Sequence, residues 1–288
     1  WTWGSSMSAN SIFSNLTAEN TAAEISLILS ADYKRKKTVI LLEGEDDVKV
    51  FRFLVGEDVT LIKAYGASTT VDKFMPENFP DEKRVIGIRD KDYQTKKRFE
   101  RIFYCDYCCC EMMLVSDDET FEKLAVNFYR GKLPYSKLRY EILSKLFYLS
   151  VVRLCSDRYR WGLRISDTDL SKIINPRLNP TRAAVINFIN AYNPRNKINS
   201  KREKQIACVR NTGKITDYLE ITNGHDFVEA MLIYCAQSSS SNKRRSLTDK
   251  AISGALRCAY SLSAFKKTRL YSDLTEYGRQ NGFIITRE

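Results

Sequence analysis

Three short runs of apolar and β-branched residues constrain the fold of this chain more than any other feature. Each run is five residues long, which is too short for a stable helix and typical of a buried strand. The runs are Thr38–Leu42, Val59–Lys63 and Arg84–Ile88. Helices are predicted over Ala18–Ser30, from about Asp46, and over Val71–Met75. Strands that alternate with helices at such intervals predict βαβ units and a parallel sheet.

From about Asp117 the hydrophobic period becomes that of helices. The predicted helices are Glu119–Arg130, Ser136–Cys155, Pro180–Tyr192, Asp226–Gln237 and Leu247–Ser261. Asn179 and Pro180 are predicted as the cap and the first-turn residue of one of them. The predicted fold class is therefore α/β, a parallel sheet with helices followed by a mostly helical, basic C-terminal part. The predicted divisions are an expression scar (1–6), an N-terminal helix (7–36), a catalytic domain (37–130) and a basic helical domain for nucleic-acid and partner binding (131–288).

The charge is divided unevenly along the chain. Residues 1–130 carry 18 basic and 22 acidic side chains, a net of −4, whereas residues 131–288 carry 28 basic and 13 acidic, a net of +15. A surplus of this size favours a polyanionic partner, and we expect nucleic acid rather than a membrane surface. The sequence has no run of about 18 apolar residues and no signal-like segment after Met7. We therefore expect a cytoplasmic protein that does not enter a membrane.

Three carboxylates follow predicted strands. Glu43 ends the first strand, and Asp90 and Asp92 follow the third. Ligands of parallel sheets bind beyond the carboxyl ends of the strands, so these acids are expected at one edge. If the backbone stays extended, Asp90 and Asp92 also point to the same side. Hard oxygen ligands suit Mg²⁺, with Mn²⁺ as an alternative, and such a site supports phosphodiester hydrolysis.

The sequence around these acids resembles the TOPRIM domain. The resemblance is carried by Val-Ile-Leu-Leu-Glu43-Gly44-Glu45-Asp46-Asp47, then Gly66, then Ile-Gly-Ile-Arg-Asp90-Lys91-Asp92. It covers roughly residues 37–120. Among TOPRIM proteins, the motif ending at Asp47, the Asp-x-Asp-Tyr motif and Glu111 before Met-Met-Leu most resemble the AriB family of the PARIS anti-phage defence system.

The resemblance implies a Rossmann-like TOPRIM fold over residues 37–130. It implies catalytic roles for Glu43, Asp90, Asp92, Asp47 and Glu111, with the first three as metal ligands. The AriB family implies a toxic endoribonuclease of the bacterial cytoplasm that cleaves RNA, tRNA foremost, in abortive infection. It further implies an AriA-like ABC-type ATPase sensor that holds the nuclease, a phage trigger protein that acts through the sensor, and a homodimer after release.

The residues leave two other functions open. The chain has no Gly-x-x-x-x-Gly-Lys-[Ser/Thr] phosphate loop, so any ATPase acts in trans. Its 288 residues are few for a TOPRIM topoisomerase or primase. A non-cleaving TOPRIM subunit of an ATPase complex remains an alternative, as does a DNA-directed nuclease, because DNA and RNA offer the same phosphates. The intact Glu43, Asp90 and Asp92 favour an enzyme.

Basic clusters and neighbouring aromatic residues mark a possible nucleic-acid surface. The predicted phosphate contacts are Arg158, Arg160, Lys201, Arg202, Lys243 and Arg244. Tyr159, Trp161 and Tyr192 are of the type that stacks on unpaired bases. The alternative is that these clusters are solvated loops and that the aromatic rings pack in the core.

The cysteines and the single histidine carry weaker signals. Four of the eight cysteines lie within residues 105–110, but a zinc site needs about four ligands, usually in two pairs. We expect buried, reduced thiols there. His225 lies at the start of a predicted helix, where a structural role is favoured over that of a base or a phosphate contact.

Overall fold

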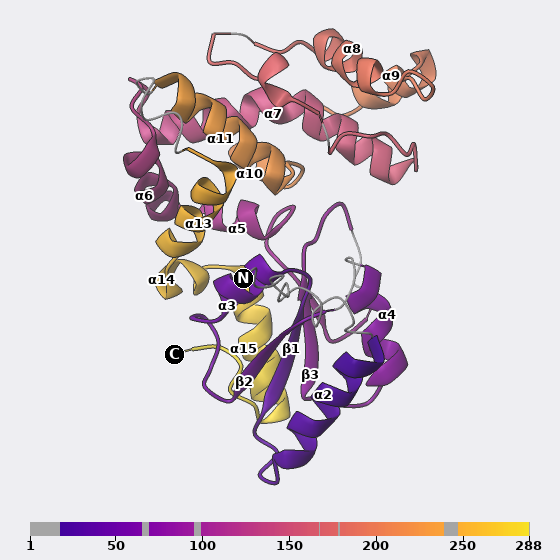
Figure 1. Ribbon diagram of the computed structural model, residues 1–288, viewed down its shortest axis with the longest axis vertical. Coiled ribbons are helices and arrows are strands. Elements are labelled where there is room, and N and C mark those ends of the chain that lie inside the picture. Colours follow the sequence, from indigo (N-terminus) through magenta and orange to yellow (C-terminus); the bar gives the residue numbers. More distant parts are fainter. Residues whose placement is uncertain are drawn as a thin grey trace, which may run out of the picture. The chain divides into compact units, whose positions relative to one another are not determined.

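The computed structural model describes residues 18–64, 69–94, 99–166, 168–177, 179–238 and 247–287 (Figure 1). Some predictions fall elsewhere in the chain. The glycine turn at Gly66, the basic residues Lys243 and Arg244, and the expression scar at residues 1–6 all lie outside the described residues.

A four-stranded sheet forms the centre of the first compact unit. Its strand order is β2-β1-β3-β4, and β1 pairs in parallel with both β2 and β3. The strands are β1 (Thr38–Leu42), β2 (Val59–Lys63), β3 (Val85–Arg89) and β4 (Ile102–Tyr104). Every residue of β1 and β3 is buried, as expected for inner strands covered on both faces. Opposite Leu42, the last residue of β1, lies Ile88 of β3, so the carboxyl ends of both strands are adjacent.

Four helices belong with this sheet. They are α2 (Ala18–Ala31), α3 (Glu45–Phe51), α4 (Thr69–Asn78) and α15 (Arg269–Asn281). Helix α3 contacts β1 and β2, and α4 contacts β3. The chain's end joins the same unit: Val55 and Thr286 form an antiparallel bridge, and the Tyr277 hydroxyl donates to the Lys83 carbonyl. The last helix therefore completes the sheet unit although it is distant in sequence.

The second compact unit is helical. Its helices are α5 (Cys110–Ser116), α6 (Asp118–Phe128), α7 (Tyr135–Arg158), α8 (Arg182–Tyr192), α9 (Ser200–Ala207), α10 (Ile215–Leu219), α11 (Gly224–Ser238), α13 (Asp249–Ala259) and α14 (Leu262–Phe265), with a 3₁₀ turn η1 (Leu170–Lys172). Helix α7 is buried on several sides, and α6, α8, α9, α10 and α11 pack against it. It is thus the central helix of this unit.

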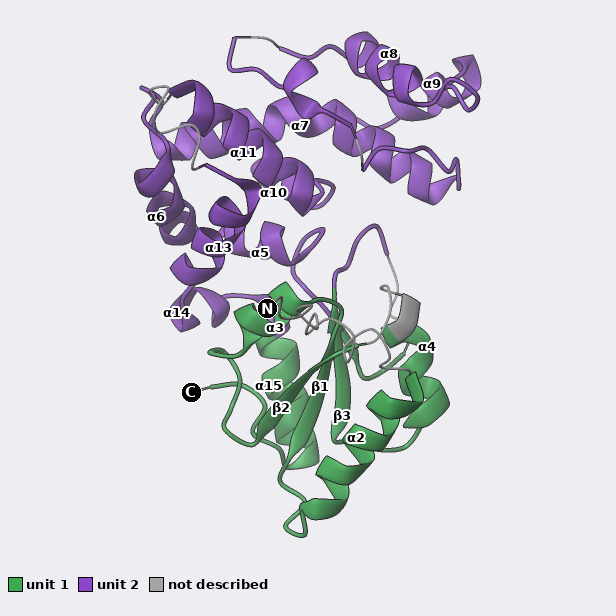
Figure 2. Cartoon of the chain, in the orientation of Figure 1, with its two compact units in different colours: residues 1–89, 97–103, 271–288 green, residues 90–96, 104–270 purple. Residues whose placement is uncertain are grey.

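The compact units divide the chain differently from the predicted domains (Figure 2). The sheet unit comprises residues 1–89, 97–103 and 271–288, and the helical unit comprises residues 90–96 and 104–270. The predicted boundary at residue 130 followed the change in charge. Helices α5 and α6 nevertheless pack on α13 and α7, which places them with the helical unit. Charge composition does not record such long-range packing.

Most predicted elements are confirmed, with shifts at their ends. The first two strands have the predicted bounds, and the third is displaced by one residue. Helix α4 runs through Pro76, which was predicted to lie in the following loop. The cap of α8 is Thr181 rather than Asn179, because the Thr181 hydroxyl accepts from the Ala184 amide at 3.2 Å. Helices α5, α9, α10, α14 and α15 and strand β4 were not predicted. No helix in the described ranges has the length and apolar character to cross a membrane.

The closeness of α4 to β3 can be tested at Gly87. A Cβ atom there would lie 2.7 Å from Val71 Cγ1, so Gly87→Ala is expected to cost about 1–3 kcal/mol of stability by overpacking. Gly254→Ala is the matched control, because its Cβ would lie 3.8 Å or more from its neighbours within helix α13. That control should gain about 0.5–1 kcal/mol. Urea denaturation measures both, and equal effects would contradict the packing described here.

Candidate functional site

Glu43 lies directly after β1 and forms an ion pair with the last residue of β3. Arg89 Nε is 2.9 Å from Glu43 Oε1, and Arg89 Nη1 donates to Asp72 Oδ2 of α4 at 2.5 Å. Arg89 is only 4% exposed, so its guanidinium depends on these two carboxylates for compensation. The charge of Glu43 is therefore already balanced within the sheet unit.

Asp47, the other predicted acid of this unit, has a capping position. Its Oδ2 accepts from the Gly44 amide at 2.9 Å, and the Val48 amide donates to the Gly44 carbonyl. This arrangement closes the first turn of α3. Three acids occupy that turn, where the positive end of the helix dipole favours them. In this structure Asp47 stabilises the turn that follows Glu43.

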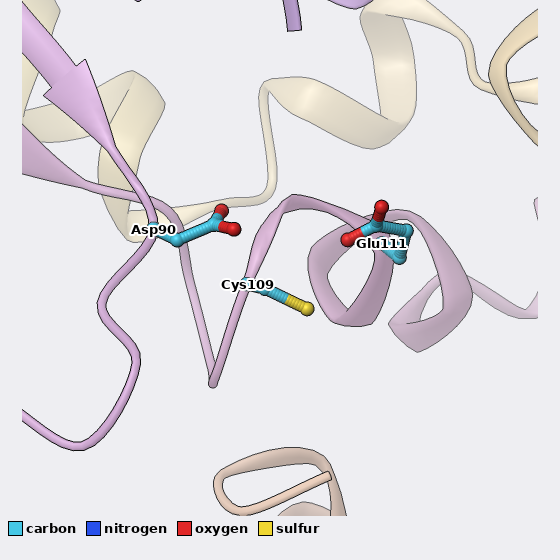
Figure 3. Close-up of side chains that lie close together, drawn as sticks. All are labelled: Asp90, Cys109 and Glu111. Atoms are coloured by element: carbon cyan, nitrogen blue, oxygen red, sulfur yellow. The ribbon is translucent and has the colours of Figure 1, made fainter. Parts of the chain in front are cut away.

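In the helical unit, two predicted acids converge. Figure 3 shows Asp90, from the loop after β3, together with Cys109 and Glu111 from the start of α5. One ligand atom from each of the three side chains lies within 4.8 Å of the others. Asp90 Oδ1 also accepts from the Cys110 amide at 2.7 Å, which fixes this carboxylate at the amino end of α5.

The chemistry of these three side chains fits Mg²⁺ in part. The carboxylates of Asp90 and Glu111 are hard oxygen donors, and Mg²⁺ sites commonly use one or two carboxylates with waters completing the shell. The Cys109 thiol fits poorly, because soft sulfur ligands select other metals than Mg²⁺. A hydrogen bond with Cys108, burial and the neighbouring acids also raise the pKa of this thiol well above its usual range. The oxygen pair is therefore the part of the group suited to this ion.

Gly224, the first residue of α11, lets Glu111 occupy this position. A Cβ atom on Gly224 would lie 2.3 Å from Glu111 Oε2 and 2.9 Å from its Cβ. Only glycine therefore accommodates the side chain as placed. Gly224 thus acts on the site, whereas the next residue, His225, has an exposed side chain and lies in the first turn of α11.

Asp92 does not join the carboxylate pair, which corrects the prediction of an extended Asp-x-Asp segment. Strand β3 ends at Arg89, and Asp92 has a φ of 49°. Its amide donates to the Cys108 carbonyl at 2.6 Å, so the chain turns and the strand alternation is lost. The Lys91 side chain pairs with Glu220 at 2.6 Å, and Asp92 lines a separate cavity with Tyr93 and Arg153.

The predicted nucleic-acid residues have two different environments. Arg158 and Arg160 are exposed at the end of α7, and Lys201 is exposed on α9. The guanidinium of Arg202 instead lies 5.2 Å from the centre of the Trp161 ring and donates to Asn196 Oδ1. Trp161 is buried and stacks on the half-exposed Tyr159. Arg202 and Trp161 thus support the surface on which the other cations lie.

The expectation of buried thiols is confirmed for the cysteine cluster. Cys105, Cys108, Cys109 and Cys110 are all buried and form no disulfide. Within the described ranges, only Cys109 joins a group of side chains able to hold a metal, and its two companions are carboxylates. The cluster therefore contributes to the core around the start of α5.

Comparisons with known protein families and with curated proteins found no match. The TOPRIM resemblance therefore depends on the motifs. The α/β fold with parallel pairing of β1, β2 and β3 is consistent with a Rossmann-like arrangement.

Sequence reasoning missed Arg89 and Asp72, which hold Glu43. A signal existed for Arg89, because a charged residue ends an otherwise apolar buried strand and therefore needs a partner. Nothing local in the sequence identified Asp72 as that partner, since it lies 17 positions away.

The ion pairs of Arg89 with Glu43 and Asp72 predict different effects for two Glu43 variants. Glu43→Ala removes one of the two carboxylates that compensate buried Arg89, and it should cost about 1–3 kcal/mol of stability. Glu43→Gln keeps an oxygen for Arg89 and should cost less. Urea denaturation of both variants tests this, and equal stability of the two would contradict the described role of Arg89. Glu43→Gln is also the better variant for activity measurements.

The contact between Gly224 and Glu111 predicts a loss of metal affinity. Gly224→Ala should displace the Glu111 carboxylate and weaken Mg²⁺ binding about tenfold, measured by isothermal titration calorimetry. Gly254→Ala is the matched control in α13 and should bind Mg²⁺ as the unmodified protein does. Unchanged affinity in a folded Gly224→Ala protein would remove Glu111 from the metal site.

Proposed function

We propose that this protein is a divalent-metal-dependent phosphodiesterase of the TOPRIM type that cleaves RNA. The observation that carries the proposal is the convergence of Asp90 and Glu111, two acids predicted from the motifs, on one point beside the first turn of α5. Enzymes that cleave phosphodiesters commonly bind a hard cation through paired carboxylates. Mg²⁺ is the proposed cofactor, with Mn²⁺ as an alternative.

Each of the two acids has a distinct part in this proposal. Asp90 and Glu111 would hold the ion, which when bound polarises a phosphate oxygen and lowers the pKa of a coordinated water. The Cys110 amide donates to Asp90 Oδ1, and this hydrogen bond fixes the orientation of the whole carboxylate. Glu111 occupies the space that a side chain at position 224 would fill. The catalytic role of Glu43 remains a prediction from the motifs.

The polyanionic substrate is supported by the charge of the helical unit. Residues 90–96 and 104–270, which make up this unit, hold 30 basic and 18 acidic side chains, a net of +12. Phosphate contacts from such a surface give strong, salt-dependent binding. The family resemblance makes the substrate tRNA and the protein a toxic effector of anti-phage defence. In this proposal an AriA-like ABC-type ATPase holds the nuclease until a phage trigger protein is sensed, and the released nuclease is a homodimer.

A second candidate is a non-cleaving TOPRIM subunit of an ATPase complex. The pairing of Glu43 with buried Arg89 favours it, because a carboxylate that compensates an arginine can be retained for stability alone. The two candidates differ in what the acids of the helical unit do. A non-cleaving subunit needs no metal at Asp90 and Glu111, whereas the nuclease does.

The nuclease proposal predicts loss of cleavage without loss of fold in isosteric variants. Asp90→Asn keeps an oxygen for the Cys110 amide but removes the charge, and Glu111→Gln does the same for the other acid. Each should reduce Mg²⁺-dependent cleavage of tRNA at least about a hundredfold, because ligands of one ion act as a unit. Glu122→Gln, an exposed change on α6, is the control and should cleave normally.

The assay follows the release of new RNA ends from purified tRNA, with duplex DNA as a parallel substrate. Preferential cleavage of the DNA would overturn the RNA assignment and leave a DNA-directed nuclease. Full cleavage by a folded Asp90→Asn protein would overturn the metal site. An unmodified protein that binds the ATPase but cuts neither substrate would establish the non-cleaving subunit.

A further inference from the structure

A cavity of about 370 Å³ lies in the helical unit, beside Asp92. It is formed by the loop after β3, the end of α7, the turn that follows α7, and the segment before α11. Its volume is within the range of pockets that take small molecules or a single group of a larger ligand. All of its lining residues belong to one compact unit.

The walls of this cavity combine apolar surface with hydrogen-bond acceptors. Tyr93, Leu163 and Ile165 provide the apolar part. Asp92 and Asp157 provide carboxylates, which only accept hydrogen bonds when ionised. A flat ring with N–H groups on its edge matches this combination, since the ring contacts apolar side chains and the edge donates to the acids.

The charges at the cavity exclude a free anion as the preferred occupant. Arg153, which also lines it, is held by Asp226 through two contacts of 2.6 Å, and Asp226 is 3% exposed. The arginine is therefore already compensated. Asp92, Asp157 and Arg160 are the other charged residues that line the cavity, so the cavity does not carry a positive surplus. A neutral ring fits these charges better than a phosphate does.

Arg160 has a backbone conformation that is unfavourable for a residue other than glycine. It follows the last turn of α7 with a φ of 52°, and its amide donates to the Asp157 carbonyl. Glycine is the usual residue at such a helix end because L-residues with a positive φ are strained. An exposed arginine in this strained conformation is explained if its side chain binds a ligand at the mouth of the cavity.

The cavity is joined to the carboxylate pair through short hydrogen bonds. The Asp92 amide donates to the Cys108 carbonyl, and Asp90 accepts from the Cys110 amide. The two aspartates are thus fixed to the same short segment at the start of α5. A group bound beside Asp92 is consequently held close in the chain to the acids of the proposed metal site.

We infer that this cavity binds one unstacked nucleobase that carries an exocyclic amino group, with Arg160 contacting the phosphate of the same nucleotide. The inference rests on the proposed nuclease function, for which it supplies a means of choosing the nucleotide near the metal site. Adenine and cytosine offer an amino group where hypoxanthine and uracil offer a carbonyl, which would repel the carboxylates. We assign the base to an RNA strand. A free nucleotide offers the same chemical groups, so the experiment below compares the two sources.

Binding of labelled pentaribonucleotides, measured by fluorescence anisotropy in EDTA, tests the inference without any cleavage. The probes are oligouridine with uridine, cytidine, adenosine or inosine at the centre. We expect cytidine to bind about tenfold more tightly than uridine, and adenosine than inosine, since hydrogen bonds to charged acceptors are strong. Asp157→Asn should abolish this difference, while the control Asp249→Asn, an exposed acid on α13, should keep it.

A second variant separates binding from stability. Arg160→Gly should weaken all four probes similarly and make the salt dependence of binding shallower, while thermal stability stays the same or rises. Loss of stability in this variant would indicate a structural role and overturn the assignment of Arg160.

The other outcomes are equally decisive. Equal binding of all probes by the unmodified protein, or discrimination that survives Asp157→Asn, would overturn the base pocket. If cytidine monophosphate bound as tightly as the pentaribonucleotide, the assignment of the base to an RNA strand would be wrong. Discrimination retained by an Asp90→Asn protein supports the pocket whether or not that protein cleaves, so failure of the pocket and failure of the nuclease proposal are distinguishable.

Discussion

The parallel pairing of β1 with β3 is the constraint from which the rest of this structure follows. It sets Leu42 opposite Ile88, and the chain therefore leaves both strands at the same edge of the sheet. Glu43 follows one strand and Arg89 completes the other, so a negative and a positive side chain meet at that edge. The backbone register, and not a local preference of either residue, creates the ion pair.

Charge compensation then decides what each acid can do. In the sheet unit, Arg89 compensates Glu43 and Asp72, and all three side chains are largely removed from water. In the helical unit, Asp90 receives a backbone amide from the start of α5, which is weaker compensation than a full positive charge. The two acid groups are thus held in different ways, Glu43 by an arginine and Asp90 by a backbone amide.

The strands were predictable because their signal is local. Five consecutive apolar or β-branched residues define β1, and the glycine and acids that follow define the turn into α3. The convergence of Asp90 and Glu111 was predictable only through the family motifs, because 21 positions separate these residues. The turn at Asp92 was not predictable, since it depends on a hydrogen bond to Cys108, whose own placement depends on packing in the helical unit. The packing of α15 in the sheet unit was not predictable for the same reason. Its contacts are with residues far away in the sequence, since Tyr277 of α15 contacts Lys83 and Phe103.

The arrangement of Asp90 and Glu111 also has an energetic consequence. Two carboxylates held within 4.8 Å repel each other, and the fold places them there through contacts that serve no evident packing purpose for the acids themselves. The absence of a side chain at Gly224 leaves room for Glu111, and the Cys110 amide donates to Asp90, so both help to keep the pair together. A cation bound between the two carboxylates would remove this repulsion, and metal binding would then be coupled to the stability of the helical unit.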